Sequence, residues 1–158
     1  MPLLREFQPA DAKQVFALHE RALEATGAFT KRGPWDHDLE NIEEIYVRPG
    51  GCFYVIEEAN AIIAMGALKR HAKGEGEIKR MRVAPEKQRQ GLGQQLLNVL
   101  LETAKERGIL KIILDTTNQQ SAAQKFYVKN GFRETRREKL RTMTVIYYER
   151  IIPTSPRS

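Results

Sequence analysis

The chain has 158 residues, of which 41% are hydrophobic and 29% are charged, and its formal net charge is +6. This composition is typical of a soluble globular protein and excludes a disordered chain. No apolar run approaches the length of a membrane span, so we expect no membrane contact. The length favours a single domain, which we place at 1–152, followed by a flexible tail over 153–158.

Cysteine content and the N-terminal residues bear on the compartment. The first residues show no basic start followed by an apolar core, so we expect no secretory signal. The single cysteine, Cys52, cannot form an internal disulfide, which fits a reducing compartment. We therefore expect a cytoplasmic protein. No recognition helix, zinc finger or aromatic stacking pattern favours nucleic acid as a partner.

The N-terminal half is predicted to contain a strand, two helices and two further strands. Residues 3–7 alternate as a strand does, and Pro9-Ala10-Asp11 opens a helix with one apolar side that runs to about Thr26. Turn-forming residues over 27–38 predict a loop, and apolar residues at helical spacing over 39–46 predict a second, short helix. Strands over 52–57 and 62–69 follow, joined by a tight turn.

The stretch 77–108 combines a strand, a turn and a helix. Its strand ends at Val83, and its helix begins directly after Gly91-Leu92-Gly93. Glycines at the start of a helix leave backbone N–H groups open, and the helix dipole adds partial positive charge that favours an anion such as a pyrophosphate. Glycines that only form the turn are the alternative. Neither a Walker loop nor a dinucleotide fingerprint fits, because Gln94, Gln95 and Leu96 follow Gly93.

The last third of the chain is predicted to add three strands and a helix. A continuous apolar run over 109–115 is typical of a strand covered on both faces. A helix over 119–130 is capped by Gly131, and two strands over 132–137 and 143–151 form an antiparallel pair. The pair carries a basic cluster that indicates either a solvated face or attraction to an anionic partner. The cluster comprises Arg133, Arg136, Arg137, Lys139 and Arg141.

Two motifs, taken together, resemble the GNAT superfamily of N-acetyltransferases, over roughly residues 3–150. The first is Val83-Ala84-Pro85 followed by Gln88-x-x-Gly91-x-Gly93, and the second is Ala123-x-x-x-Tyr127-x-x-x-Gly131-Phe132. The resemblance implies an α/β (α+β) fold with a mixed, mostly antiparallel central sheet of about seven strands and about four helices on its two faces. It also implies that the strands at 77–83 and 109–115 splay apart.

The same resemblance implies acetyl-CoA as cosubstrate, an amine acceptor and no metal. The pantetheine arm is expected to bind like an added strand along Met81-Arg82-Val83, and an N–H near Val83 is expected to bind the thioester oxygen. Gln120 stands where many relatives carry an asparagine, and Asn118 is the nearby substitute. The residues expected to hold the cofactor are Met81, Arg82, Val83, Gln88, Arg89, Gln90, Gly91, Leu92, Gly93, Gln94, Asn118 and Gln120.

A general acid is needed to protonate the departing thiolate. Tyr127 matches the catalytic tyrosine of the family, and a phenol with an ordinary pKa of about 10 is protonated at neutral pH. A tyrosine that only packs its ring is the alternative. Tyr147 and Tyr148 are alternative acids on the last strand.

A general base is needed to neutralise the acceptor ammonium. Glu77 matches a glutamate that histone-acetylating members use, and Asp115 lies near the place where some ribosomal-protein-acetylating members carry one. Either takes the proton through a water if its surroundings raise its pKa. We rank Glu77 first, Asp115 second and His71 third, with plain carboxylates at strand ends as the alternative for the first two.

The sequence does not identify the amine that accepts the acetyl group. Phe29 and Trp35 are candidate substrate contacts, and Trp35 as a core anchor is the alternative. Asp36, Asp38 and Glu77 favour a cationic acceptor, whereas the basic residues over 137–141 favour an acidic one. Small-molecule and protein or peptide amines both fit. A non-catalytic acyl-CoA-binding regulatory module and a basic nucleic-acid-binding domain are the competing functions, and a homodimer is a further alternative.

Overall fold

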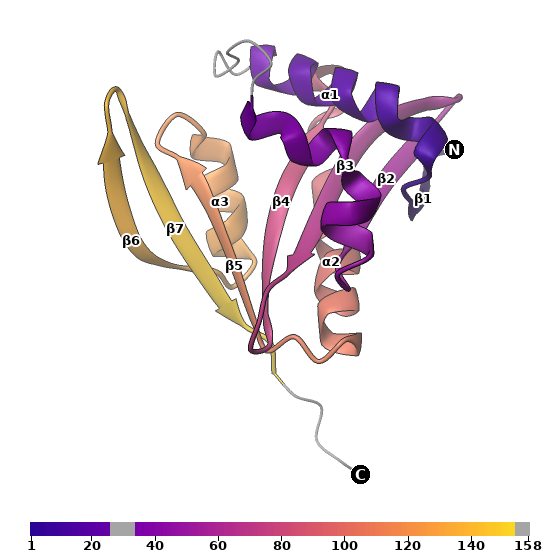
Figure 1. The fold of residues 1–158 in the computed structure, drawn as a ribbon. Helices are drawn as coiled ribbons and strands as arrows, with labels where there is room; N and C mark the ends of the chain where they lie inside the picture. Colours follow the sequence, from indigo (N-terminus) through magenta and orange to yellow (C-terminus); the bar gives the residue numbers. More distant parts are fainter. Residues whose placement is uncertain (26–33, 154–158) are drawn as a thin grey trace.

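A seven-stranded sheet in the order β1-β2-β3-β4-β5-β7-β6 forms the centre of the computed structural model, which describes residues 1–25 and 34–153 (Figure 1). The strands β4 and β5 run parallel, whereas the other neighbouring strands pair antiparallel. The mixed, mostly antiparallel sheet inferred from the sequence is therefore confirmed. The strands are β1 (Leu3–Glu6), β2 (Cys52–Glu58), β3 (Ala61–Arg70), β4 (Glu75–Val83), β5 (Lys111–Thr117), β6 (Arg133–Leu140) and β7 (Met143–Ile151).

The helices lie on both faces of this sheet. The α-helices of the described residues are α1 (Ala12–Ala25), α2 (Leu92–Glu106) and α3 (Ser121–Lys129). The second helix, predicted over 39–46, corresponds mainly to a π-helical turn, η3 (Glu43–Val47), and a 3-10 helix, η2 (Pro34–Glu40), precedes it where the sequence predicts a loop. One-turn 3-10 helices, η1 (Pro9–Asp11) and η4 (Pro85–Lys87), precede α1 and follow β4. Helix α1 and the η2–η3 segment cover one face of the sheet, and α2 covers the other (Figure 1).

The apolar spacing that predicts α1 and α2 marks the faces that these helices bury. In α1, Val15 and Leu18 pack into a core cluster with β2 and β3. In α2, Leu97 and Leu100 are fully buried in a second cluster that also takes in β5, β7 and Tyr127 of α3. Burial of each such leucine contributes roughly 2 kcal/mol, so these faces hold α2 and α3 against the sheet.

Strands β4 and β5 part after a short paired stretch, as the family resemblance implies. Their paired residues are Glu75 with Lys111, Gly76 with Ile112 and Glu77 with Ile113, and pairing stops there. A bulge in β4 helps to turn this strand away, because the register with β3 shifts between Met65 and Ala67. Backbone N–H and C=O groups of β4 beyond Glu77 therefore lack a strand partner on the β5 side.

A glycine, Gly66, lies opposite this bulge and makes room for the side chain of Met81. At Gly66 an added Cβ would lie 2.6 Å from Sδ of Met81 and 3.2 Å from Cδ1 of Leu100. Within the bulge Arg80 adopts a left-handed conformation, with a φ of 59°. The bulge thus brings a strained arginine and a tightly packed Met81 side chain to the point where the sheet opens.

None of the helices in the described ranges is both long and apolar enough to cross a membrane. The tail expected from the sequence falls, apart from Pro153, on residues 154–158, outside the described part of the chain.

Candidate active site

A cleft of about 270 Å³ lies where β4 and β5 part. It is lined by Glu77, Ile78, Lys79, Arg80, Met81, Arg82, Asp115, Thr116, Thr117, Gln120, Ala123 and Tyr127. A second pocket of about 330 Å³ extends toward α1 and the turn before α2, lined by Ala22, Leu23, Met81, Arg82, Val83, Gln88, Gln119, Gln120, Ser121, Ala122 and Ala123. Because the two share Met81, Arg82, Gln120 and Ala123, they form one groove along the unpaired side of β4.

Tyr127 reaches the cleft from α3 with its ring held by other aromatic side chains. The ring centroids of Phe126 and Phe132 lie 5.4 Å and 5.7 Å from its own. Burial raises the pKa of its phenol to about 12, although the positive charge of Arg82 acts in the opposite direction. The phenol is therefore protonated at neutral pH and has a proton to donate.

Two carboxylates line the same cleft from the two parting strands. Glu77 belongs to the last paired position of β4, and Asp115 lies on β5 two residues beyond its last pair with β4. The pKa of Asp115 lies above its ordinary value, first because neighbouring side chains displace water from its carboxylate and second because Glu77 is close, although part of the residue stays exposed. Tyr127, Glu77 and Asp115 thus share one cleft.

A histidine holds one of these carboxylates. Nε2 of His71, in the loop after β3, lies 2.9 Å from Oε1 of Glu77. The antiparallel register of β3 and β4, which places Lys69 opposite Glu77, brings His71 to this position. Sequence reasoning ranked His71 as a third base but gave no sign of its contact with Glu77, because that contact depends on the hairpin register.

The start of α2 presents open backbone N–H groups. Gly91 caps the helix with a φ of 80° and no side-chain hydrogen bond, and a Cβ added there would meet no atom of the described residues within 4 Å. The side chain of Gln94 turns away, donating to Oδ1 of Asn98 at 2.9 Å and of Asn130 at 2.8 Å. An uncapped helix start of this kind fits the pyrophosphate of coenzyme A.

Of the other residues expected to hold the cofactor, some line the groove and others lie in the core or at the surface. Gln88 and Gln120 line the groove, whereas Leu92 is buried in the core. Arg89 and Gln90 are exposed in the turn before α2. Asn118 is occupied elsewhere, because its Oδ1 accepts the backbone N–H of Thr144 at 2.8 Å. Asn118 lines neither pocket of the groove, whereas Gln88, Gln119 and Gln120 do, and Gln120 lines both.

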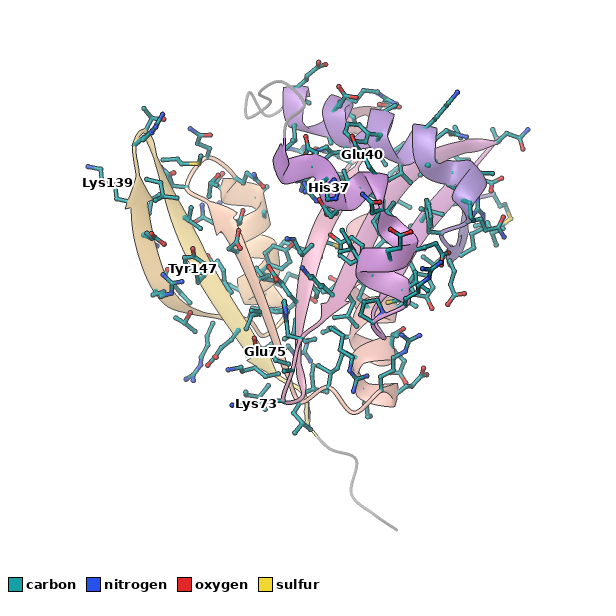
Figure 2. The ribbon with its side chains drawn as sticks, viewed as in Figure 1. His37, Glu40, Lys73, Glu75, Lys139 and Tyr147 are labelled. Carbon is teal, nitrogen blue, oxygen red and sulfur yellow. The ribbon has the colours of Figure 1, made fainter. Side chains whose placement is uncertain are left out.

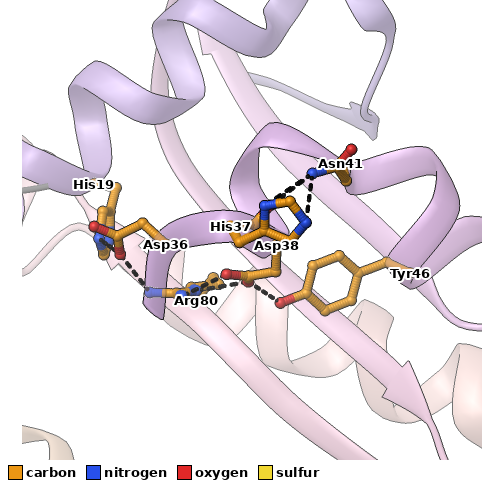
Figure 3. A network of polar contacts seen from close by, with 7 residues as sticks. All are labelled: His19, Asp36, His37, Asp38, Asn41, Tyr46 and Arg80. Atoms are coloured by element: carbon orange, nitrogen blue, oxygen red, sulfur yellow. Dashed lines mark hydrogen bonds and ion pairs between the residues drawn. The ribbon is translucent and has the colours of Figure 1, made fainter. Parts of the chain in front are cut away.

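Asp36 and Asp38 belong to a polar network under α1 (Figure 3). Arg80 donates to the two carboxylate oxygens of Asp38 at 2.9 Å and 2.6 Å, and its NH1 lies 3.5 Å from Asp36. His19 lies 3.0 Å from Asp36, and the hydroxyl of Tyr46 donates to Asp38. The two aspartates are thus paired within the protein, which corrects the expectation that they attract a cationic acceptor.

The remaining candidates lie away from the cleft or outside the described residues. Tyr147 lies on the β6–β7 hairpin, where its hydroxyl donates to Glu138 at 3.2 Å (Figure 2). Tyr148 is buried, with its ring centroid 6.4 Å from that of Tyr127. Phe29 lies outside the described residues, and so does the side chain of Trp35.

Comparison with known proteins gives matches to acetyltransferases. The family model described as "Acetyltransferase (GNAT) family" matches residues 14–132. The chain is 30% identical to human N-acetyltransferase 8 over 122 residues, 68% of this chain and 53% of that protein. It is 33% identical to the uncharacterised N-acetyltransferase YedL of Escherichia coli over 86 residues, 53% of this chain and 54% of that protein. The chain therefore spans about half the length of these curated relatives.

Two solved structures share the fold over nearly the whole chain. A GNAT-family acetyltransferase from Staphylococcus aureus has a TM-score of 0.88 at 25% identity, covering 97% of this chain and 100% of that one. The PaiA N-acetyltransferase of Thermoplasma acidophilum, solved in complex with coenzyme A, has a TM-score of 0.81 at 20% identity, covering 96% and 99%. With the family model matching residues 14–132 and the splayed sheet in place, this chain belongs to the GNAT acetyltransferase family.

Proposed function

We propose that this chain is an acetyl-CoA-dependent N-acetyltransferase that acts on a primary amine, of a small molecule or of a protein or peptide, by direct attack in a ternary complex. The observation that carries the proposal is the meeting of Tyr127, Glu77 and Asp115 in one cleft between β4 and β5. Residues 1–152 act as one domain in this proposal. The relative solved with coenzyme A, which has the same fold, supports the choice of cosubstrate.

The groove along β4 is the proposed place of the cofactor. The unpaired side of Met81, Arg82 and Val83 offers main-chain groups to the pantetheine arm, in the manner of an added strand. Gln88 and Gln120 line the same groove. The pyrophosphate lies against the open N–H groups around Gly91 and Gly93, with Arg89 adding positive charge nearby.

In the proposed reaction, each of these side chains gives or takes a different proton. Acetyl-CoA supplies an acetyl carbon that becomes bonded to the amine nitrogen as its bond to sulfur breaks, and the sulfur leaves as a thiol. Tyr127 gives its phenol proton to that sulfur. Glu77 or Asp115 takes the proton of the acceptor ammonium, directly or through a water, so the products are an N-acetyl amine and coenzyme A. The nitrogen loses its second proton as the amide forms, and this proton passes to Tyr127, directly or through a water, and returns it to its neutral form. The carboxylate releases the first proton to solvent.

The proposal is tested by release of free coenzyme A from acetyl-CoA, measured with a thiol reagent in the presence of a panel of amines. The panel includes amino acids, amino acid amides, polyamines and short peptides with a free N-terminus. Acetyl-CoA is also expected to raise the melting temperature, because a ligand that binds only the folded state stabilises it. Binding without amine-dependent release would assign the chain as a non-catalytic acyl-CoA-binding module, and absence of both would contradict the proposal.

A further inference from the structure

Arg82 is an arginine whose guanidinium has almost no partners in the described part of the chain. Its NH1 donates to the carbonyl of its neighbour Met81 at 2.9 Å. Its Nε is buried and has no hydrogen-bond partner, one of two such side-chain atoms among the described residues. Buried charged donors are costly when they stay unsatisfied, so a partner that comes with a ligand would explain the presence of an arginine here.

The acidic residues on the α1 side of this guanidinium already form salt bridges with another arginine. Asp36 and Asp38 interact electrostatically with Arg82, but both are within 4 Å of Arg80, which holds them in salt bridges of 3.5 Å and 2.6 Å. The side chains of Asp36 and Asp38 are 4% and 13% exposed. Their salt bridges are made to Arg80, and neither aspartate forms one with Arg82.

Arg82 lies at the junction of the groove. It lines both the cleft that holds Glu77, Asp115 and Tyr127 and the pocket that continues toward Gln88. Burial is the main reason why its pKa falls to about 10, and the charge of Arg80 lowers it further, while Tyr127, Asp36 and Asp38 act in the opposite direction. The guanidinium is still charged at neutral pH. Of the other cations that line the cleft, Arg80 is paired with Asp38, and Lys79 acts on Asp38 and Asp115. Within the described residues, Arg82 forms no ion pair with Glu77 or Asp115, the two carboxylates of the cleft.

We propose that Arg82 binds a carboxylate of the acceptor, so that the acceptor is an amino acid or a related amino carboxylate. The inference rests on the proposed function and names its substrate class. With its ammonium toward Glu77 or Asp115 and its carboxylate on the guanidinium of Arg82, such a molecule would match the separated charges of the cleft. Acetyl transfer to its amine proceeds as described above, and the carboxylate takes no part in bond making.

A carboxylate fits this position better than other charged groups. The planar guanidinium presents parallel N–H donors that match the two oxygens of a carboxylate. A phosphate dianion would add charge to a cleft of about 270 Å³ that already contains Glu77 and Asp115. A polyamine would place a second cation near Arg82, which disfavours it for the same reason.

The kinetic test compares acceptors that differ only in this group. Each L-amino acid is paired with its amide, and kcat/KM for amine-dependent release of coenzyme A is measured for both. The wild-type protein is expected to favour the acid by about 10-fold or more, mainly through KM, because a charge-assisted hydrogen bond of this size is lost in the amide. Arg82→Gln is expected to bring the ratio close to 1, and Arg82→Lys to recover part of it.

Arg133→Gln is the matched control, because Arg133 is an exposed arginine of β6 that pairs with Glu149 and lines neither pocket of the groove. This variant should keep the wild-type preference. Equal use of acids and amides by the wild type would overturn the inference while leaving the acetyltransferase itself in place. A loss of kcat with all acceptors in Arg82→Gln, without a change in the ratio, would also overturn it and would place Arg82 against the thioester instead.

A binding measurement separates failure of the inference from failure of the proposed function. Two conjugates are made in which the sulfur of coenzyme A is joined through an acetyl linker to the amine of an amino acid or of its amide. The wild type is expected to bind the acid conjugate about 10-fold more tightly, and Arg82→Gln to bind both alike. Equal Kd values in the wild type overturn the inference alone, whereas absence of binding to either conjugate overturns the proposed function and the inference with it.

Discussion

Nε2 of His71 lies 2.9 Å from Oε1 of Glu77 at the point where β4 and β5 cease to pair. The side chains of His71 and Glu77 are 33% and 17% exposed, so the contact lies at the edge of the cleft. It ties the carboxylate to the loop after β3 and limits its rotation. A base that is held in one orientation removes a proton more effectively than a freely rotating one.

The first prediction concerns the two carboxylates. Glu77→Gln is expected to lower kcat/KM by about 100-fold, because it removes the preferred base and keeps the shape of the side chain. Asp115→Asn is expected to have a smaller effect. The measurement is the initial rate of coenzyme A release at amine concentrations well below KM. The reverse order of the two effects would assign the base to Asp115.

His71→Gln tests the tie to Glu77. Glutamine keeps a donor but loses the ring, so the rate is expected to fall by less than in Glu77→Gln, about 10-fold or less. The double variant His71→Gln/Glu77→Gln should be no slower than Glu77→Gln alone, because His71 acts through Glu77. Additive losses in the double variant would show that His71 has a role of its own.

The second prediction concerns the acid. Tyr127→Phe is expected to keep the affinity for acetyl-CoA and to lower kcat by about 100-fold or more, because the thiolate must then leave without a proton. Burial raises the pKa of this phenol to about 12. The phenol therefore stays protonated as pH rises, and the wild-type rate should not fall on its account up to about pH 10. If Tyr127→Phe kept the wild-type rate at every pH, Tyr127 would not be the general acid.

Much of this site follows from local sequence signals. The strand that ends at Val83, the glycine pair and the apolar face of α2 follow one another in the chain, so periodicity and turn chemistry are enough to predict them. The splay of β4 and β5 came from the family resemblance and is confirmed. Tyr127 came from a motif in the same way, and it lines the cleft as that motif implies.

The parts that the sequence did not predict depend on partners far apart in the chain. Arg80 is 42 residues from Asp38, and no local pattern indicates that it neutralises the aspartates that seemed free to attract an acceptor. The side chain of Asn118 accepts a hydrogen bond from the backbone N–H of Thr144, 26 residues away. The loop predicted over 27–38 contains most of the 3-10 helix η2, and the helix predicted over 39–46 is largely a π turn. Both depend on distant contacts, such as that of Asp38 with Arg80 of β4, which local spacing does not show.

The third prediction separates backbone strain from ligand binding at the start of α2. Gly91 has a φ of 80°, and Gly108, just beyond the other end of α2, has a φ of 72°. No atom of the described residues lies within 4 Å of a Cβ added at either glycine. Gly91→Ala and Gly108→Ala are each expected to lower the free energy of unfolding by about 1 kcal/mol. Gly91→Ala alone should weaken coenzyme A binding, by about 10-fold.

Gly93→Ala completes this comparison. Its φ is not in the left-handed region, and the nearest atom to an added Cβ is Cζ of Phe126 at 3.9 Å, an ordinary contact. Stability should therefore change little. Chemical denaturation and titration with coenzyme A measure the two effects. Equal losses of affinity in Gly91→Ala and Gly108→Ala would mean that the helix start does not hold the pyrophosphate.

The fourth prediction concerns stability at low pH. Burial is the largest reason why the pKa of His19 falls from 6.5 to about 4, and the charges of Arg82 and Arg80 lower it further, while Asp36 acts against them. Between these values the unfolded chain binds a proton that the folded protein does not. Stability therefore decreases as pH falls from 6.5 toward 4, by up to about 1.4 kcal/mol per pH unit.

Urea unfolding at several pH values measures this slope. His19→Gln keeps a donor toward Asp36 but cannot titrate, so its slope in this range should be lower than that of the wild type. His37, which is exposed on η2, supplies the control (Figure 2). His37→Gln should leave the slope unchanged, and a slope that is the same in all three proteins would contradict the assignment to His19.

Amide hydrogen exchange with and without acetyl-CoA tests the placement of the cofactor most directly. The account predicts slower exchange at Met81–Val83, where the pantetheine arm adds to β4, and at Gly91–Gln94, where the N–H groups meet the pyrophosphate, with no change in the β6–β7 hairpin. Unchanged exchange in both segments at a saturating concentration of acetyl-CoA would contradict it.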